Sequence, residues 1–356
     1  MQNLIERLRM RIPARADGFL IQTPVNRRYL TGFKSSAGFL LILKEDAVFL
    51  TDFRYMEAAE AAIQTVRVER YSKISDTFSE YRKKYNLRCL LVEHDQLKIG
   101  ELERMQAAFQ GVKLAYDKKL DELISELRLV KTPEDIRKIR AAQELTEEAF
   151  RHILPQIRPG VTERELALEI EYHMRRQGAE GVAFDPIVVS GENSAKPHGV
   201  PTDKAIEKGD FVTMDTGAML DGWHSDMTRT VVVGTPTEEQ REIYEIVLRA
   251  QETAIKAVRR GADCEQVDAD ARTVIRDAGY GEAFGHSTGH GVGMEIHEAP
   301  NLAPGSQRIL MPGNVVTIEP GIYLNGKFGV RIEDMVVVTD TGCENLTKCP
   351  KKLITL

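Results

Sequence analysis

Short apolar runs alternate with charged, amphipathic stretches along the first part of the chain. Residues 38–43 and 47–51 are almost wholly apolar and flank the charged triplet 44–46, a pattern typical of two strands joined by a hairpin turn. A further apolar run at 89–92 predicts another buried strand, and residues 55–62 have the spacing of a helix. Strands interspersed with helices in this way indicate a small α/β domain.

A charged, helical passage over residues 117–131 leads away from this region. It is followed by Thr132-Pro-Glu-Asp135, where threonine suits the N-cap, proline the first helical position and the acids the first turn. A chain of 356 residues has room for two domains at roughly 150 residues each. We therefore expect an α+β protein with an N-terminal domain over 1–125 and a second domain over 126–356.

The second domain contains an internal repeat. Gly160-Val-Thr-Glu-Arg-Glu165 is matched by Gly261-Ala-Asp-Cys-Glu-Gln266, and both read as a glycine, an N-cap residue and a capping-box acceptor three residues later. The helices that begin there are expected to end at Gly178 and Gly279, where glycine can adopt a left-handed conformation. The duplicated helix signals predict two halves with the same local structure.

The repeat continues into strands that carry acidic residues. Residues 209–217 resemble 313–321, and Asp226-Met227 before a valine run resembles Glu333-Asp-Met335 before another. Each half therefore supplies two carboxylates in corresponding places. Two halves related by a pseudo-twofold axis would bring the four acids together at the centre of the domain.

These acids and one histidine form the strongest candidate for chemistry. Four carboxylates and an imidazole, without a thiolate, suit divalent cations such as Mn, Co, Fe or Zn. Two cations about 3.5–4 Å apart need carboxylates that both can share. The sequence therefore predicts a two-metal site formed by Asp215, Asp226, His290, Glu319 and Glu333.

The aspartates flank a predicted hairpin turn at Asp221-Gly222. If the hairpin is centred between residues 220 and 221, Asp215 and Asp226 face each other with Cβ atoms about 4.5–5.5 Å apart. A centre two positions off would still leave them diagonal neighbours across the strand pair. Opposed like charges destabilise a plain hairpin, so a bound cation is the expected remedy.

The composition and net charge of the chain argue against nucleic acid and membranes as binding partners. A net charge of −6 and a pI near 5.9 give no general attraction to nucleic acid or anionic lipid. No apolar run approaches the roughly 18 residues of a membrane span, and the first ten residues mix both charge signs, as in an amphipathic helix rather than a signal peptide. The four cysteines lack paired spacing, which favours reduced thiols in the cytoplasm: Cys89, Cys264, Cys343 and Cys349.

The segments that carry the five ligands resemble the metal site of the pita-bread metallopeptidases, whose fold is also a duplication. Residues 26–33 and 51–55 resemble the creatinase/prolidase-type N-terminal domain, which the methionine aminopeptidases of the family lack. The resemblance therefore points to the branch that cleaves Xaa-Pro bonds, the prolidases and Xaa-Pro aminopeptidases. It implies a pita-bread catalytic domain, short peptides with proline in second position as substrates, two metal ions with manganese as the first candidate, and a homodimer.

The resemblance also assigns roles to residues around the ligands. His198 matches a histidine that contacts substrate, His297 one that steadies the scissile carbonyl, and His286 one typical of the proline-specific branch. Glu319 is expected to act as ligand and proton shuttle. Arg331, two residues before Glu333, is expected to hold the shared carboxylate, meet substrate or form a plain salt bridge.

Two other functions share this fold. A catalytically inactive binding protein of the family would have lost ligands, whereas all five are present here. A creatinase-like enzyme hydrolyses its substrate without metal, and the intact ligand set argues against it. Substrate length stays open: prolidases often carry an arginine after the His-Glu-x-Pro segment, where this chain has Asn301, with Arg308 nearby as a substitute.

Overall fold

The computed structural model describes residues 4–356, which divide into two compact units, one ending at Arg128 and one spanning Leu129–Leu356. The expected boundary at residue 125 falls inside helix α6 (Lys119–Leu129). Among residues 4–356, every helix is too short or too polar to cross a membrane. The mixture of helices and sheets is the α+β organisation expected from the sequence.

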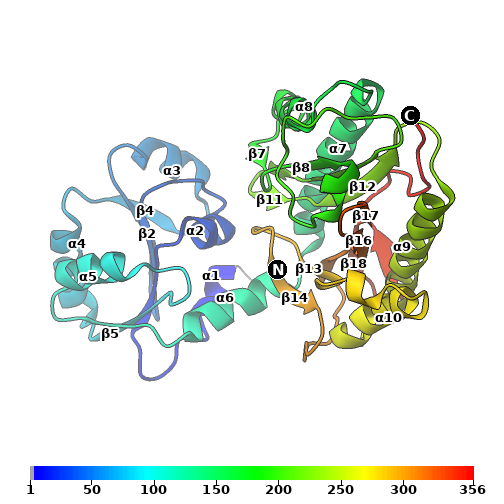
Figure 1. Cartoon of the computed structure of the whole chain (residues 1–356). Helices are drawn as coiled ribbons and strands as arrows, with labels where there is room; N and C mark the ends of the chain where they lie inside the picture. The colour runs from blue at the N-terminus through cyan, green and yellow to red at the C-terminus, as the bar shows by residue number, and fades with distance from the viewer. Residues whose placement is uncertain (1–3) are drawn as a thin grey trace. The chain divides into compact units, whose positions relative to one another are not determined.

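The N-terminal unit is built on one six-stranded mixed sheet in the order β4-β3-β2-β1-β5-β6 (Figure 1). Its strands are β1 (Gly18–Ile21), β2 (Phe39–Leu43), β3 (Ala47–Thr51), β4 (Arg67–Arg70), β5 (Cys89–Val92) and β6 (Lys113–Ala115). Its other helices are α1 (Leu4–Arg9), α2 (Pro24–Thr31), α3 (Met56–Ala62), α4 (Ile74–Tyr85) and α5 (Ile99–Ala108). Residues 1–3 of the amphipathic helix expected at the start lie outside the described part.

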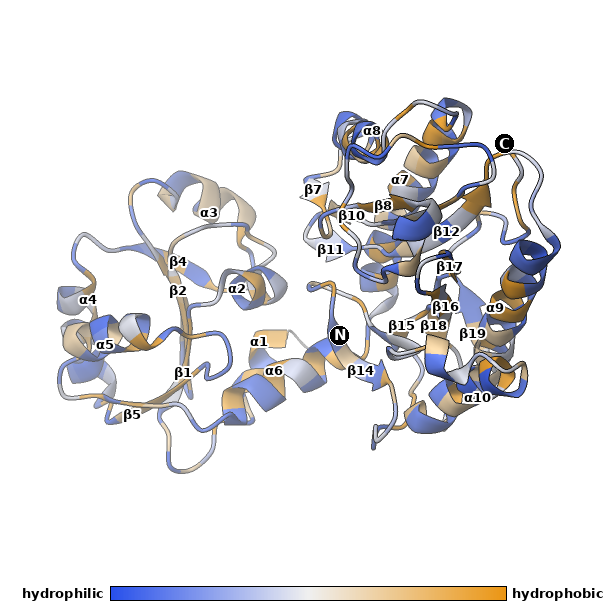
Figure 2. Ribbon diagram, viewed as in Figure 1, coloured by the Kyte–Doolittle hydropathy of each residue, from blue (hydrophilic) through white to orange (hydrophobic). Residues whose placement is uncertain are grey.

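Apolar runs form these strands because both faces of the sheet are covered. Along β2, Leu40 and Ile42 belong to one hydrophobic cluster, while Leu41 and Leu43 belong to another. The strands β1 and β2 accordingly appear in hydrophobic colours (Figure 2). The predicted hairpin between β2 and β3 is confirmed, with the Leu43 N–H donating to the Asp46 carbonyl at 2.7 Å.

The second unit consists of two halves with the same plan. The first half contains α7 (Pro133–Ile153), α8 (Glu163–Arg176), β7 (Gly181–Val182), β8 (Ile187–Ser190), β9 (Phe211–Thr216), β10 (Ala218–Leu220), β11 (Trp223–His224) and β12 (Met227–Val232). The second contains α9 (Glu238–Ala257), α10 (Cys264–Asp277), β13 (Gly289–Gly291), β14 (Glu298–Leu302), β15 (Val315–Ile318), β16 (Gly321–Leu324), β17 (Phe328–Arg331), β18 (Asp334–Val338) and β19 (Cys343–Asn345). In Figure 1, α7 and α8 lie beside the strands of the first half, and α9 and α10 beside those of the second.

Backbone hydrogen bonds repeat between the halves, which confirms the duplication. The N–H of Gly160 donates to the Ile206 carbonyl, and that of Gly261 donates to the Leu310 carbonyl, both at 2.9 Å. Gly178 and Gly279 have φ of 106° and 91°, the left-handed conformation expected after α8 and α10.

One detail of the predicted repeat is wrong. Thr162 and Glu165 form the expected capping box at the start of α8. At the start of α10, however, Asp263 accepts from the backbone N–H of Glu265, and the Gln266 side chain donates to Asp270 at 2.8 Å. A competing acceptor one turn along the helix therefore draws Gln266 away from the cap.

Candidate metal centre

A hairpin in the first half positions the two aspartates. Asp221 and Gly222 both have positive φ, 50° and 80°, as a two-residue turn between twisted strands requires. The turn is therefore centred one residue later than a direct pairing of the aspartates needs. Thr228 lies opposite Asp215, and Asp226 is two residues from Thr228. Direct opposition is thus wrong, and the diagonal arrangement is the one observed.

The second-half hairpin brings the two glutamates face to face. In the β15–β18 pair, Ile318 lies opposite Asp334. In the β16–β17 pair, which follows along the same hairpin, Gly321 lies opposite Arg331. The register is the same in both pairs, so Glu319 lies opposite Glu333. The two halves thus present their acids in different registers, although their sequences match.

His290 enters from strand β13, which lies beside β15. A Cβ atom on Gly289 would be 1.9 Å from the Thr317 carbonyl, so only glycine permits this approach. The ring Nδ1 of His290 lies 3.1 Å from the Gly291 carbonyl. If Nδ1 carries the proton and donates it there, Nε2 is left as an acceptor, 3.6 Å from Asp226 Oδ2 and 3.5 Å from Glu319 Oε1.

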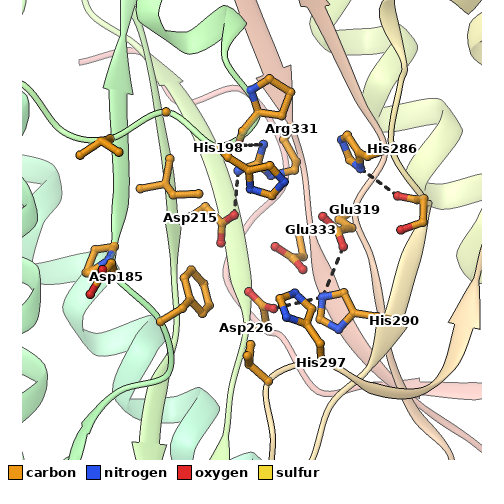
Figure 3. A pocket seen from close by; sticks show the side chains of 18 of the residues that line it. Asp185, His198, Asp215, Asp226, His286, His290, His297, Glu319, Arg331 and Glu333 are labelled. Carbon is orange, nitrogen blue, oxygen red and sulfur yellow. Dashed lines mark hydrogen bonds and ion pairs between the residues drawn. The ribbon is translucent and has the colours of Figure 1, made fainter. Parts of the chain in front are cut away.

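All nine residues singled out from the sequence line one cavity of about 600 Å³. In Figure 3 the five expected ligands point toward a common centre, with His198, His286 and His297 around it. Apolar residues complete the wall, including Phe184, Ile187, Val200 and Ile296. The cavity therefore combines a strongly acidic centre with apolar surface that suits a small hydrophobic group such as a proline ring.

The acidic centre fits divalent cations. Asp226, His290 and Glu333 each offer a ligand atom within 4.8 Å of the others. Asp215 Oδ1 is buried and has no hydrogen-bond partner among residues 4–356, which is costly for a carboxylate unless a cation fills the place. Carboxylate oxygens with one imidazole are the donors that such ions take from proteins.

Without a cation, burial changes the acidity of these groups. Burial, followed by the charge of Glu333, raises the pKa of Asp226 well above its usual range. Burial and then the charge of Glu319 do the same to the pKa of Glu333. Burial, opposed by Arg331 and reinforced by Asp215, raises the pKa of Glu319 to about 8. Burial also lowers the pKa of His290 to about 4, so its ring is neutral and available as a ligand.

The metal-free protein is therefore expected to lose thermal stability as the pH rises from 6.5 to 8. The pKa of Glu319 is 4.5 in an unfolded chain and about 8 when folded, so the folded state holds a proton that the unfolded state releases. His286 and His290, whose pKa is lowered from 6.5 to about 4, act in the opposite sense, and their contribution fades above pH 6.5 as the histidines of the unfolded chain lose their protons. Calorimetry of metal-free and metal-loaded protein checks this, and a Tm that stays level or rises across the window in the metal-free form contradicts it.

Arg331 organises one wall of the site. Its buried guanidinium donates to Asp215 Oδ2 at 2.7 Å, to the Tyr323 hydroxyl at 2.8 Å and to Thr228 Oγ1 at 3.1 Å. Thr228 in turn donates to Glu333 Oε2 at 2.7 Å. Arg331 thus donates to Asp215 directly, and Thr228 links it to Glu333 by hydrogen bonds.

The structure brings in residues that the sequence analysis missed. The Tyr323 hydroxyl lies 2.8 Å from His286 Nε2, and the other ring nitrogen of His286 lies 2.8 Å from the Ser287 carbonyl. Thr317 donates to Glu319 at 3.3 Å and accepts from the His290 N–H at 3.0 Å. Thr228 and Thr317 stand two residues from a ligand on the same strand face, so strand periodicity was the available signal. Tyr323 had no such signal.

His198 and His297 lie at more open positions of the cavity. His198 is exposed on the loop before Gly199, and His297 is exposed immediately before β14. The His297 ring lies 4.3 Å from the His290 ring, centroid to centroid, in an edge-to-face contact. Asn301 also lines the cavity, whereas Arg308 is not among the lining residues.

Both units of the chain are similar to known protein families. The model of the creatinase/prolidase N-terminal domain matches residues 2–130, and that of metallopeptidase family M24 matches residues 137–340. The Xaa-Pro dipeptidase of Pyrococcus furiosus is 40% identical over 341 residues, covering 95% of each chain. Among solved structures, an Xaa-Pro dipeptidase from Bacillus anthracis has 44% identity and a TM-score of 0.94, covering 99% of both chains. An X-Pro aminopeptidase from Thermotoga maritima has 38% identity and a TM-score of 0.92 with the same coverage.

Proposed function

Because this chain belongs to metallopeptidase family M24, we propose that it hydrolyses the peptide bond between an N-terminal residue and a following proline, with divalent metal ions as cofactors. The observation that carries the proposal is the single cavity that gathers all five expected ligands and the three additional histidines. An inactive binding protein of this fold, or a metal-independent creatinase-like enzyme, would not need that ligand set.

Two ions per chain are proposed, with manganese as the first candidate and cobalt, zinc or iron as alternatives. Asp226 and Glu333 would be shared, because they come from different halves and each offers a carboxylate oxygen within 4.8 Å of the other. Asp215 would serve one ion, and His290 with Glu319 the other. A donor set rich in oxygen suits manganese. Intrinsic affinity would instead favour cobalt or zinc, so the availability of each metal in the cell decides which ion is bound.

The residues of the chain would act on a substrate as follows. When bound, the cations lower the pKa of water and polarise the scissile carbonyl. Proline leaves as a secondary amine and must be protonated, and Glu319 is the carboxyl placed to carry that proton. The imidazole of His297, or that of His198, would donate to the carbonyl oxygen as negative charge develops there. The substrate's free N-terminus would lie near the metals or Asp215, which limits cleavage to the first residue.

His297→Ala is expected to keep both metals and lower kcat by about 10²–10³-fold, as the loss of an oxyanion donor does elsewhere. Its ring lies beside His290 but is not among the atoms that converge on the candidate cation position. Elemental analysis and steady-state kinetics on the same preparation check this. Loss of metal in the variant would instead make His297 a ligand or a structural residue.

We further propose a cytoplasmic homodimer. The four cysteines are free in the structure, which suits a reducing compartment. The dimer follows from the family resemblance, and light scattering after size exclusion tests it.

A peptide panel tests the proposed activity. Dialysed protein is assayed with Mn, Co or Zn against Xaa-Pro dipeptides, Xaa-Pro-Xaa tripeptides and matched Xaa-Ala peptides, with creatine as a control. Metal-dependent release of the first residue from proline peptides alone is expected, and the ratio of dipeptide to tripeptide turnover gives the substrate length. Metal retention without hydrolysis would favour the binding protein, and turnover of creatine without metal the creatinase-like enzyme.

A further inference from the structure

We propose that a buried ion pair between Lys131 and Glu298 positions the side chains of His290 and His297, an inference that rests on the proposed function. Lys131 Nζ lies 2.6 Å from Glu298 Oε1, and the two side chains are 1% and 9% exposed. Neither residue has a role in the reaction described above. The pair joins parts of the second unit that are far apart in the sequence.

Hydrogen bonds hold the backbone around Lys131 in place. It lies between α6 and the Thr132 N-cap of α7, and its backbone N–H donates to the Gly313 carbonyl at 2.9 Å. The Asn314 side chain donates to the Leu129 carbonyl at 2.8 Å. Gly313 and Asn314 directly precede β15, which leads to Glu319. The ammonium group is therefore held relative to the strand that carries a metal ligand.

Glu298 lies close to both His290 and His297, where strand β14 pairs with β13. Glu298 is the first residue of β14 and pairs with Gly291 of β13. His290 directly precedes Gly291, and His297 directly precedes Glu298. The Glu298 carboxylate also packs on Gly293, where a Cβ atom would lie 2.2 Å from Oε1. One side chain thus fixes the junction from which the two imidazoles project.

Both imidazoles depend on this junction. The Gly291 carbonyl that orients His290 through Nδ1 belongs to the residue paired with Glu298. Within residues 4–356 the His297 ring makes no hydrogen bond and is held by its backbone and by its contact with His290. A shift of β14 would therefore turn His297 directly and His290 through Gly291.

Stability alone is a weak reason for such a pair. Replacing a buried ion pair with apolar residues of similar volume is often neutral or stabilising, because two charges must be stripped of water. A charge-assisted hydrogen bond differs from apolar packing in fixing a direction. A contact that fixes direction is what β14 needs, because the His297 ring beside it has no hydrogen bond of its own within residues 4–356.

The test is a double-mutant cycle of Glu298→Gln, Lys131→Met and both together. Each variant is expected to lower kcat by about 10–100-fold, the usual effect of losing a partner that orients a ligand. KM and the metal content at saturating Mn should stay within twofold of the wild type. The double variant should be no slower than either single one, because the residues act as a unit. The double variant removes both charges of the pair, so it decides the question if a single variant fails to fold.

Lys204→Met is the matched control, since Lys204 Nζ also lies 2.6 Å from a carboxylate, that of Asp210, and lines no part of the cavity. It should change thermal stability without changing kcat. Effects that multiply in the double variant, or a kcat that is unchanged wherever the protein is folded, would overturn the proposal.

Histidine ring signals give a reading that is independent of turnover. In protein labelled at histidine Cε1, the NMR resonances of His290 and His297 should move in Glu298→Gln and in Lys131→Met, and stay in place in Lys204→Met. If the wild type cleaves no proline peptide, the proposed function fails, while these spectra still decide the positioning role. Unmoved resonances in both pair variants would refute it.

Discussion

Asp226→Asn is expected to remove at least one of the two metal ions and to abolish turnover. Asp226 is buried at the centre of the cavity, with Oδ2 3.6 Å from His290 Nε2. An amide has one oxygen for coordination and cannot bridge two cations as a carboxylate does. Glu333, its counterpart in the repeat, is also buried and lies opposite Glu319, so Glu333→Gln should have a similar effect. Elemental analysis after gel filtration measures the loss.

The control for this experiment is Asp185→Asn, which removes a negative charge from the cavity wall outside the five expected ligands. It should retain both ions. Since loss of a partner that only orients a ligand typically costs about 10–100-fold, loss of a shared ligand should exceed that range. Two ions per chain in either Asp226→Asn or Glu333→Gln would show that the carboxylate concerned is not shared.

Glu319→Gln is expected to lower kcat by about 10²–10⁴-fold even when metal is saturating, the range typical of general acid–base catalysis. The amide oxygen can still coordinate a cation weakly, but the group can neither take up nor deliver a proton. The proline nitrogen is a poor leaving group unless it is protonated, so turnover should suffer much more than metal affinity.

The pH profile makes this test specific. With metal restored by excess Mn, the rate of Glu319→Gln should stay low at every pH, because no other carboxyl is proposed to carry the proton. Substrates with a better leaving group than proline should be less affected by the substitution. Near-native turnover at saturating metal would reduce Glu319 to a ligand, and the proton would then travel through water or a histidine.

Much of the secondary structure followed from local pattern. The runs at 38–43, 47–51 and 89–92 are strands because each is buried on both faces, which leaves a continuous apolar signature. Strand β4, Arg67-Val-Glu-Arg70, gave no such signal because it is an edge strand and its side chains are partly exposed. The second helix start was placed correctly at Asp263, but its capping partner was not, since the helix offers Gln266 another acceptor.

The sequence by itself determined which residues meet. The duplicated helix caps and acid-bearing strands imply two like halves, and two like halves place Asp215, Asp226, Glu319 and Glu333 at one centre. The tertiary structure alone decided how they meet. Register depends on where each turn closes, so the aspartates are diagonal neighbours while the glutamates face each other.

The sequence also could not predict the hydrogen-bond partners and pKa values of the ligand side chains. The Oδ1 atom of Asp215 that lacks a partner, the raised pKa of Glu319 and the link from Arg331 to Tyr323 all arise from burial and from contacts between distant segments. Residue type and spacing fix the chemical nature of a donor, because side-chain chemistry is local. Hydration, charge environment and hydrogen-bond partners depend on what the rest of the chain places around that donor, and these exist only once the chain has folded.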